Sequence, residues 1–288
     1  MLASDCELPF LPPATPAATP DFLLRLTSRI PAPAGTLWHQ APSTIIDATA
    51  EGDLIVRFED DTRFLIGRTG RELSLIDAPP AYTRDDLAAY VLGPILTIAL
   101  HLQGAVLLHA SSAVLGDKAV LFAGSSGSGK STTAAMLHRL GYTILSDDMT
   151  EIDGTRALPA IPTLRLWPEA LEALYGSAAA FPDRAPSWDK KIVTIDAAAA
   201  VAHEIAAILF LEHSAEEPQL RRLDPRSGWM RLIADAPAAR LPGAEARIFE
   251  ATSALADRVP MFAFLPPPLE DSSALGAFLE RELAEWLR

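Results

Sequence analysis

The stretch GSSGSGKS, from Gly124 to Ser131, decides the fold class of this chain. It fits the pattern G-x-x-x-x-G-K-[ST] in full, follows the apolar run AVLFAG and precedes a helical pattern. Its three glycines let the backbone curl around an anion with the N–H groups pointing inward. A helix that begins near Lys130 adds the positive end of its dipole at the same point. The sequence therefore predicts a phosphate-binding P-loop in an α/β fold.

The expected contacts of this loop follow from its residue types. Lys130 supplies a point charge to the β- and γ-phosphates of a nucleotide, and the Ser131 hydroxyl is a ligand for Mg²⁺. A glycine-rich turn that matches the pattern by chance is the weaker interpretation, because strand and helix flank the motif in the required order. The predicted nucleotide-binding residues are Gly124, Ser125, Ser126, Gly127, Ser128, Gly129, Lys130, Ser131 and Thr132.

Two adjacent acids, Asp147 and Asp148, end the next short apolar run. One helix and one strand fit between the loop and this pair, and a right-handed β-α-β unit brings the carboxyl ends of both strands to one sheet edge. Phosphoryl transfer needs a group that orients the acceptor and a group that holds the metal. We assign Asp147 as general base and Asp148 as metal ligand. A helix cap or a solvated turn is the alternative for such a pair.

The rest of the chain suggests three parts. Residues 1–35 form a proline- and alanine-rich arm, residues 36–82 alternate in polarity as a small antiparallel β module does, and residues 83–288 form the P-loop domain. A helical pattern opens the last part, and the stretch from Tyr90 to Ala110 fits a buried helix that leads into a strand better than a membrane span.

Composition limits the classes of partner. The chain has 24 Lys plus Arg against 37 Asp plus Glu, a formal charge of −13, so no general affinity for nucleic acid or anionic membrane is expected. The single cysteine, Cys6, allows no disulfide within the chain and fits a cytoplasmic protein. The N-terminal sequence has no positively charged stretch of the kind that opens a signal peptide.

Three motifs, HASS, GSSGSGKS and LSDD, follow one another at short intervals. In this order they resemble the catalytic core of the HPr kinase/phosphorylase superfamily, and most of all the short HPr-kinase-like proteins of lasso-peptide biosynthesis. The resemblance is specific from Val106 to Asp153. It implies ATP and Mg²⁺ as cofactors, a core related to phosphoenolpyruvate carboxykinase, His109 in the active site and Asp147 as the base.

The same resemblance extends loosely beyond the acid pair. It implies contacts of Arg165, and of Lys190 or Lys191, with phosphates or acceptor, although surface ion pairs explain these residues equally well. The glycine-rich signature of true HPr kinases does not occur between Thr150 and Tyr175, so the resemblance does not imply HPr as substrate.

The leading hypothesis is an ATP-dependent kinase that phosphorylates a serine hydroxyl of a peptide or protein, such as a ribosomally made peptide precursor. One alternative is a small-molecule P-loop kinase, although more than a hundred residues precede the loop here. Another is a protein whose partner affinity is switched by nucleotide occupancy.

Overall fold

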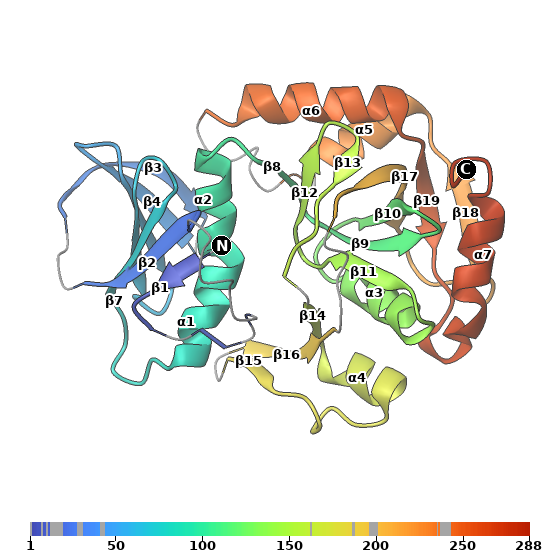
Figure 1. Cartoon of the computed structure of the whole chain (residues 1–288), viewed down its shortest axis with the longest axis horizontal. Helices are drawn as coiled ribbons and strands as arrows, with labels where there is room; N and C mark the ends of the chain where they lie inside the picture. The colour runs from blue at the N-terminus through green and yellow to red at the C-terminus, as the bar shows by residue number, and fades with distance from the viewer. Residues whose placement is uncertain are drawn as a thin grey trace. The chain divides into compact units, whose positions relative to one another are not determined.

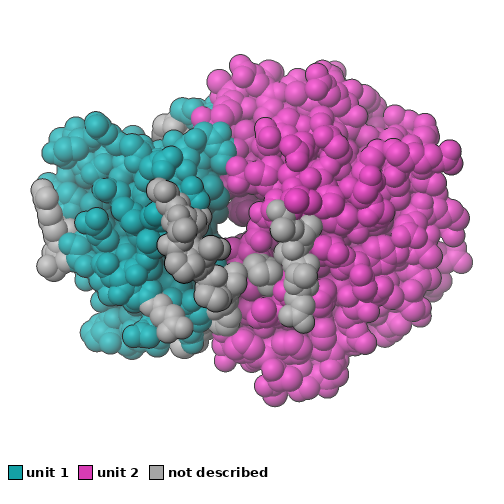
Figure 2. Space-filling model, viewed as in Figure 1, with its two compact units in different colours: residues 1–105, 185–187, 240–245 teal, residues 106–184, 188–239, 246–288 magenta. Residues whose placement is uncertain are grey.

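The computed structural model describes residues 2–6, 8–9, 11, 20–27, 31–40, 44–161, 163–185, 188–195, 201–234, 236 and 243–288 (Figure 1). These residues divide into two units (Figure 2). Unit 1 comprises residues 1–105, 185–187 and 240–245, and unit 2 comprises residues 106–184, 188–239 and 246–288. The mixed α/β composition predicted from the sequence is confirmed.

Unit 1 is built on a seven-stranded sheet in the order β1-β2-β7-β6-β5-β4-β3. Its strands are β1 (Leu2–Ser4), β2 (Phe22–Leu26), β3 (Pro33–Gln40), β4 (Thr44–Thr49), β5 (Leu54–Phe58), β6 (Arg63–Ile66) and β7 (Glu72–Asp77). The expected antiparallel pairing covers β3 to β7. The two strands at the other end of the sheet differ, because β1 pairs with β2 in parallel and β2 pairs with β7 in parallel.

The predicted boundaries of the first two parts are wrong. Strands β1 and β2 come from the predicted arm and complete the sheet, while residues 1, 7, 10, 12–19 and 28–30 of that arm lie outside the described residues. The helical segment after residue 83 also belongs to unit 1, so the division falls after Ala105. The physical reason is packing: the Tyr90 ring lies 4.3 Å from that of Phe58, and its hydroxyl donates to Asp60 at 3.0 Å.

That helical segment comprises α1 (Arg84–Tyr90), a π-helical turn (Val91–Ile95) and α2 (Leu96–Leu102). Thr83 and Asp86 form a capping box at its start, and Gly93 and Pro94 interrupt the regular helix. In the described part of the chain, Arg84–Leu102 is the one helical stretch long and apolar enough to cross a membrane, and 61% of it is buried in the protein. A buried core helix passes the same length and composition test, as the sequence interpretation expects.

Unit 2 is built on a nine-stranded sheet. Its strands run β11-β9-β10-β17-β13-β12-β8, and β19 pairs both β17 and β18. Their bounds are β8 (Val106–Leu108), β9 (Ala110–Leu115), β10 (Lys118–Ala123), β11 (Thr143–Ser146), β12 (Thr150–Asp153), β13 (Arg156–Ala157), β17 (His203–Leu211), β18 (Gln219–Arg222) and β19 (Met261–Leu265). A separate small sheet has the order β14-β16-β15, with β14 (Thr163–Leu166), β15 (Asp183–Ala185) and β16 (Trp188–Thr194).

Helices cover both faces of the large sheet (Figure 1). They are α3 (Lys130–Arg139), α4 (Pro168–Tyr175), α5 (Pro225–Ala234), α6 (Glu245–Arg258), the 3-10 helix η3 (Leu269–Ala274) and α7 (Leu275–Glu282). Along β10, Phe122 packs in the core beneath α3 and α7, whereas Leu121 packs in the core beneath α5 and α6. Because both faces of β10 are buried, its sequence is a continuous apolar run rather than an alternating one.

Candidate active site

The glycine-rich loop joins the end of β10 to the start of α3. The three glycines at 124, 127 and 129 have φ angles of +134°, +83° and +97°, which side-chain-bearing residues rarely adopt. Lys130 is buried, and its ammonium donates to the carbonyl oxygens of Gly124 at 2.7 Å and of Ser125 at 2.9 Å. The loop is therefore closed around its own lysine, with the N-terminus of α3 directly behind it.

Gly124 also allows a close backbone approach. A Cβ atom at this position would lie 3.0 Å from Ser128 Oγ and 3.4 Å from the carbonyl oxygen of Leu211. Ser128 Oγ is itself buried and has no hydrogen-bond partner among the described residues. The loop thus packs against the end of β17, the neighbouring parallel strand.

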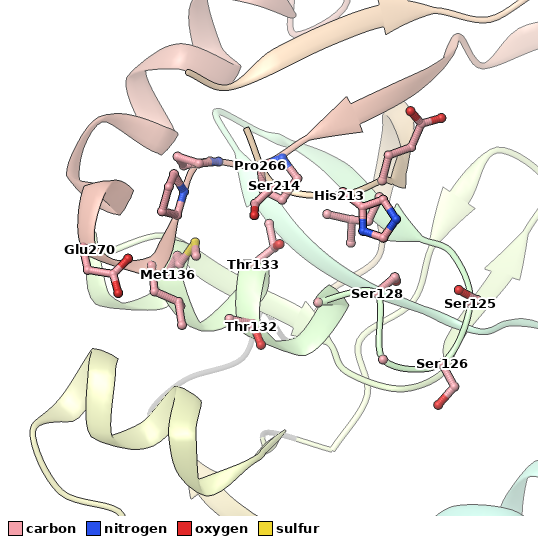
Figure 3. A pocket seen from close by; sticks show the side chains of 17 residues that line it. Ser125, Ser126, Ser128, Thr132, Thr133, Met136, His213, Ser214, Pro266 and Glu270 are labelled. Carbon is pink, nitrogen blue, oxygen red and sulfur yellow. The ribbon is translucent and has the colours of Figure 1, made fainter. Parts of the chain in front are cut away.

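A pocket of about 850 Å³ opens beside the loop (Figure 3). Figure 3 shows Thr132 and Thr133 on the first turns of α3, His213 and Ser214 after β17, and Pro266 and Glu270 after β19. Its lining residues are Ser125, Ser126, Gly127, Ser128, Gly129, Thr132, Thr133, Met136, Leu211, Glu212, His213, Ser214, Pro266, Pro267, Pro268, Leu269 and Glu270. The volume is within the range of about 300–1,000 Å³ that small-molecule sites occupy. The lining combines hydroxyl, imidazole and carboxyl side chains with apolar ones from Met136, Leu211 and the prolines at 266–268, and it adjoins the glycine-rich loop.

The acid pair lies at the same sheet edge as the loop. Strands β10 and β11 are both antiparallel to β9, which lies between them, so β10 and β11 run in the same direction. The prediction that the two strand ends share an edge therefore holds, although the strands are not direct neighbours. Because β9 runs the opposite way, its first residue Ala110 and the preceding His109 also lie at this edge.

Asp147 is held rigidly. Its Oδ1 accepts a hydrogen bond from the Ser111 hydroxyl at 2.6 Å, and its Oδ2 accepts one from the backbone N–H of Arg165 at 2.9 Å. The residue is only 9% exposed. Two donors from different strands, β9 and β14, thus orient one carboxylate.

Asp148 faces different partners. Its φ of +70° is unusual for a residue with a side chain, and only one other non-glycine residue in the described part of the chain, Asp61, has a positive φ. Its carboxylate accepts a short hydrogen bond from the Arg165 guanidinium and lies 3.8 Å from His109 Nδ1. The structure therefore brings His109, Asp148 and Arg165 together.

Three buried hydroxyl groups next to the acid pair are linked by hydrogen bonds. The Ser146 hydroxyl lies 2.6 Å from that of Ser112 and 2.6 Å from that of Thr150, which donates to the Ala110 carbonyl at 3.0 Å. Ser111, Ser112 and Ser146 lie in the motifs HASS and LSDD, but the sequence assigned no role to their hydroxyls and did not point to Thr150. The available signal was the presence of hydroxyl side chains inside otherwise apolar strands, where a buried hydroxyl needs a hydrogen-bond partner.

The two downstream lysines differ in position. Lys191 pairs with Asp183 at 2.7 Å and donates to the Phe181 carbonyl at 3.3 Å, so the surface ion-pair interpretation describes it. Lys190 instead lies over the Trp167 ring, 5.6 Å from its centroid. Of the two lysines, Lys190 is therefore the one that contacts Trp167, which follows Arg165 by two residues.

A magnesium ion fits this donor set only together with a nucleotide. Among the described residues no three His, Cys, Asp or Glu side chains form a metal-binding cluster. Mg²⁺ keeps several waters and needs only one or two carboxylates when phosphates complete its shell. The Ser131 hydroxyl and the Asp148 carboxylate are oxygen donors of the kind that it prefers.

No protein-family model and no curated protein matches the sequence. Among solved structures, the chain is similar to the Hpr(Ser) kinase/phosphatase from Coxiella burnetii, with 13% sequence identity and a TM-score of 0.30, over 62% of this chain and 97% of that chain. A TM-score this low carries no argument about fold or activity.

Proposed function

We propose that this chain is a P-loop kinase that transfers the γ-phosphoryl group of ATP to a serine hydroxyl of a peptide or protein. The observation that carries the proposal is the single sheet edge to which β10 brings the phosphate-binding loop and β11 brings the acid pair. The motifs that resemble the HPr kinase/phosphorylase superfamily are the ones at this edge. The substrate we favour is a ribosomally made peptide precursor, and the compartment is the cytoplasm.

The reaction assigns a role to each part of the edge. The loop amides, Lys130 and the start of α3 bind the phosphates, and the nucleoside occupies the pocket between α3 and the segments after β17 and β19. The serine oxygen attacks the γ-phosphorus, the bond from that phosphorus to the bridging oxygen breaks, and ADP leaves with the electron pair. Asp147 accepts the serine proton, and its two donors keep its orientation constant.

Arg165 and Asp148 neutralise each other in the chain without ligands. Asp148 and Ser131 would hold a Mg²⁺ ion that accompanies the nucleotide, and the metal would supply positive charge to the phosphate oxygens. The Arg165 guanidinium then becomes available to a phosphate oxygen, a partner that suits its planar set of donors. The ion pair therefore keeps both groups in position before the ligands arrive.

The test is transfer of label from ATP carrying ³²P at the γ-position to serine-containing peptides in the presence of Mg²⁺. We expect alkali-labile phosphoserine with the wild-type protein, and a loss of about a hundredfold or more with Asp147→Asn. Asp153→Asn is the matched control, because this exposed acid lies at the end of β12 outside the site.

Other outcomes decide between the alternatives. Label transferred to sugars or small acids but to no peptide would support a small-molecule kinase. ATP binding without any transfer would support a nucleotide-switched binding protein instead.

A further inference from the structure

The strand β14 begins next to the acid pair, where Arg165 contacts both aspartates, and continues away from it. Its residues alternate: Leu164 and Leu166 are buried in the core, and Arg165 lies on the opposite face, where it contacts Asp148. Trp167 follows with the same alternation, and it is 46% exposed. An exposed indole is thus placed two residues from the arginine of the active site.

The neighbouring strand β16 supplies a cation to the same face. The antiparallel register pairs Arg165 with Ile192 and Leu166 with Lys191, so the next step places Lys190 opposite Trp167. The ammonium of Lys190 lies 5.6 Å from the centroid of the indole, within the range of a cation–π interaction. Among the described residues no carboxylate forms an ion pair with Lys190, whereas Lys191 is paired with Asp183. We call the exposed side chain of Trp167 and the half-buried side chain of Lys190 the indole face.

The indole face lies at a distance that suits a peptide. Two residues of an extended strand span about 7 Å, so Trp167 is that far along β14 from Arg165. A serine held at Asp147 therefore has neighbours, one to three residues away along an extended peptide, that can reach the indole face. The ring offers an apolar contact, and the ammonium offers a charge for a carboxylate.

The charge of the whole chain sharpens this preference. The formal charge of −13 disfavours the approach of an acidic segment in general, and screening limits such repulsion to about 8 Å at physiological salt. Lys190 is a cation beside the place where the acceptor has to lie, whereas Arg165 is paired with Asp148. An acidic segment is thus attracted in one register and repelled in others, which gives specificity more than affinity.

We propose that the indole face is the docking site for an acidic peptide segment whose serine is the phosphoryl acceptor, with a Glu or Asp side chain near that serine. This inference rests on the proposed function, because it names the acceptor of the same site. Lys190 pairs with the acidic side chain, and Trp167 packs against the adjoining part of the peptide.

The experiment measures peptide binding apart from catalysis. A short fluorescein-labelled peptide with a serine flanked by glutamates, and a matched peptide with glutamines, are titrated with the full chain by fluorescence polarisation. Mg²⁺ and an ATP analogue with a methylene bridge between the β- and γ-phosphates are present throughout. The variants are Lys190→Glu, Trp167→Ala and, as the matched control on the other face of β16, Lys191→Glu.

We expect the glutamate peptide to bind the wild-type protein about two- to fivefold more tightly than the glutamine peptide. Lys190→Glu should abolish this preference, Trp167→Ala should weaken both peptides about fivefold, and Lys191→Glu should change neither. The affinity for the ATP analogue should be the same in all four proteins.

Four results would overturn the inference: no peptide binding, equal binding of both peptides, an equal loss in Lys190→Glu and Lys191→Glu, or weaker analogue binding in Lys190→Glu. The last result would assign Lys190 to the nucleotide. If the expected binding pattern holds but no peptide is phosphorylated, the docking site stands and the proposed kinase activity fails.

Discussion

At the scale of single residues, Lys130 has a buried charge and Asp148 has a positive φ, and both conditions are uncommon. The sequence motif predicted the role of Lys130 as a phosphate contact, because few arrangements other than a P-loop need this spacing of glycines and lysine. It could not predict that Lys130 donates to the carbonyl oxygens of Gly124 and Ser125, since such contacts depend on the folded path of the loop. Nor could it predict the positive φ of Asp148, which sits where the chain leaves β11.

Lys130→Met should remove both the charge for the phosphates and the donor that closes the loop. Loss of one such donor typically lowers turnover by about 10²–10³-fold, and we expect at least that in the phosphoryl-transfer assay. The far-ultraviolet circular dichroism spectrum should be unchanged, and Lys191→Met serves as the control. Turnover near the wild-type level in Lys130→Met would refute the role of the loop.

Asp148 allows backbone strain and chemistry to be separated. Both Asp148→Gly and Asp148→Ala remove the partner of Arg165, but only glycine adopts a φ of +70° without a steric penalty. Asp148→Gly should therefore be more stable than Asp148→Ala by about 1 kcal/mol, measured by urea unfolding. Neither variant should transfer phosphate. Equal stability of the Asp148→Ala and Asp148→Gly proteins would show that the positive φ at position 148 causes no backbone strain.

At the scale of elements, the alternation in residues 36–82 predicted an antiparallel β module, and β3 to β7 pair in that way. The apolar run AVLFAG and the helix expected near Lys130 correspond to β10 and α3, because the loop pattern requires a strand before it and a helix after it. The insertion of β9 between β10 and β11 was not predictable from spacing, since a hairpin partner can pair on either side of a strand. The run AVLLHASSAVL also divides at His109, where the chain leaves its pairing with β12 and joins β10.

Helix α7 packs very closely against the segment before β11. A Cβ atom on Gly276 would lie within 2.3 Å of the Tyr142 ring, whose hydroxyl donates to Glu280 at 3.0 Å. Gly276→Ala should therefore destabilise the protein by roughly 1–3 kcal/mol, because the ring has to move. Thermal unfolding measures this change. Gly276→Ala combined with Tyr142→Ala should lose less than the sum of the two single variants, and strict additivity would argue against the contact.

Strand β12 contains a partly buried carboxylate, that of Glu151. Burial, and to a smaller extent the charge of Asp153, raises the pKa of Glu151 above its ordinary value of 4.5. The folded chain then binds this proton more tightly than the unfolded chain, so ionisation costs stability as pH rises through that window. Glu151→Gln should raise the melting temperature at pH 7, and the gain should vanish below about pH 4. A gain that is independent of pH would exclude the electrostatic explanation.

At the scale of the whole molecule, the arrangement differs most from the sequence-based division. Composition suggested a proline-rich arm, a β module and a P-loop domain, yet the arm contributes β1 and β2 to the sheet of unit 1. Short strands with few residues give weak local signals, and their parallel pairing depends on contacts between distant parts of the chain. The candidate site needed no such long-range information, because its loop and acid pair lie within one short stretch, from Gly124 to Asp148, and belong to unit 2.

The central claim is that this stretch binds a nucleoside triphosphate, and isothermal titration calorimetry with ATP and Mg²⁺ tests it most directly. We expect saturable binding of one ATP per chain to the wild-type protein, little change with Asp147→Asn, and no measurable binding to Lys130→Met. A wild-type protein that binds no nucleotide, or a Lys130→Met variant that binds ATP as well as the wild type, would contradict the account.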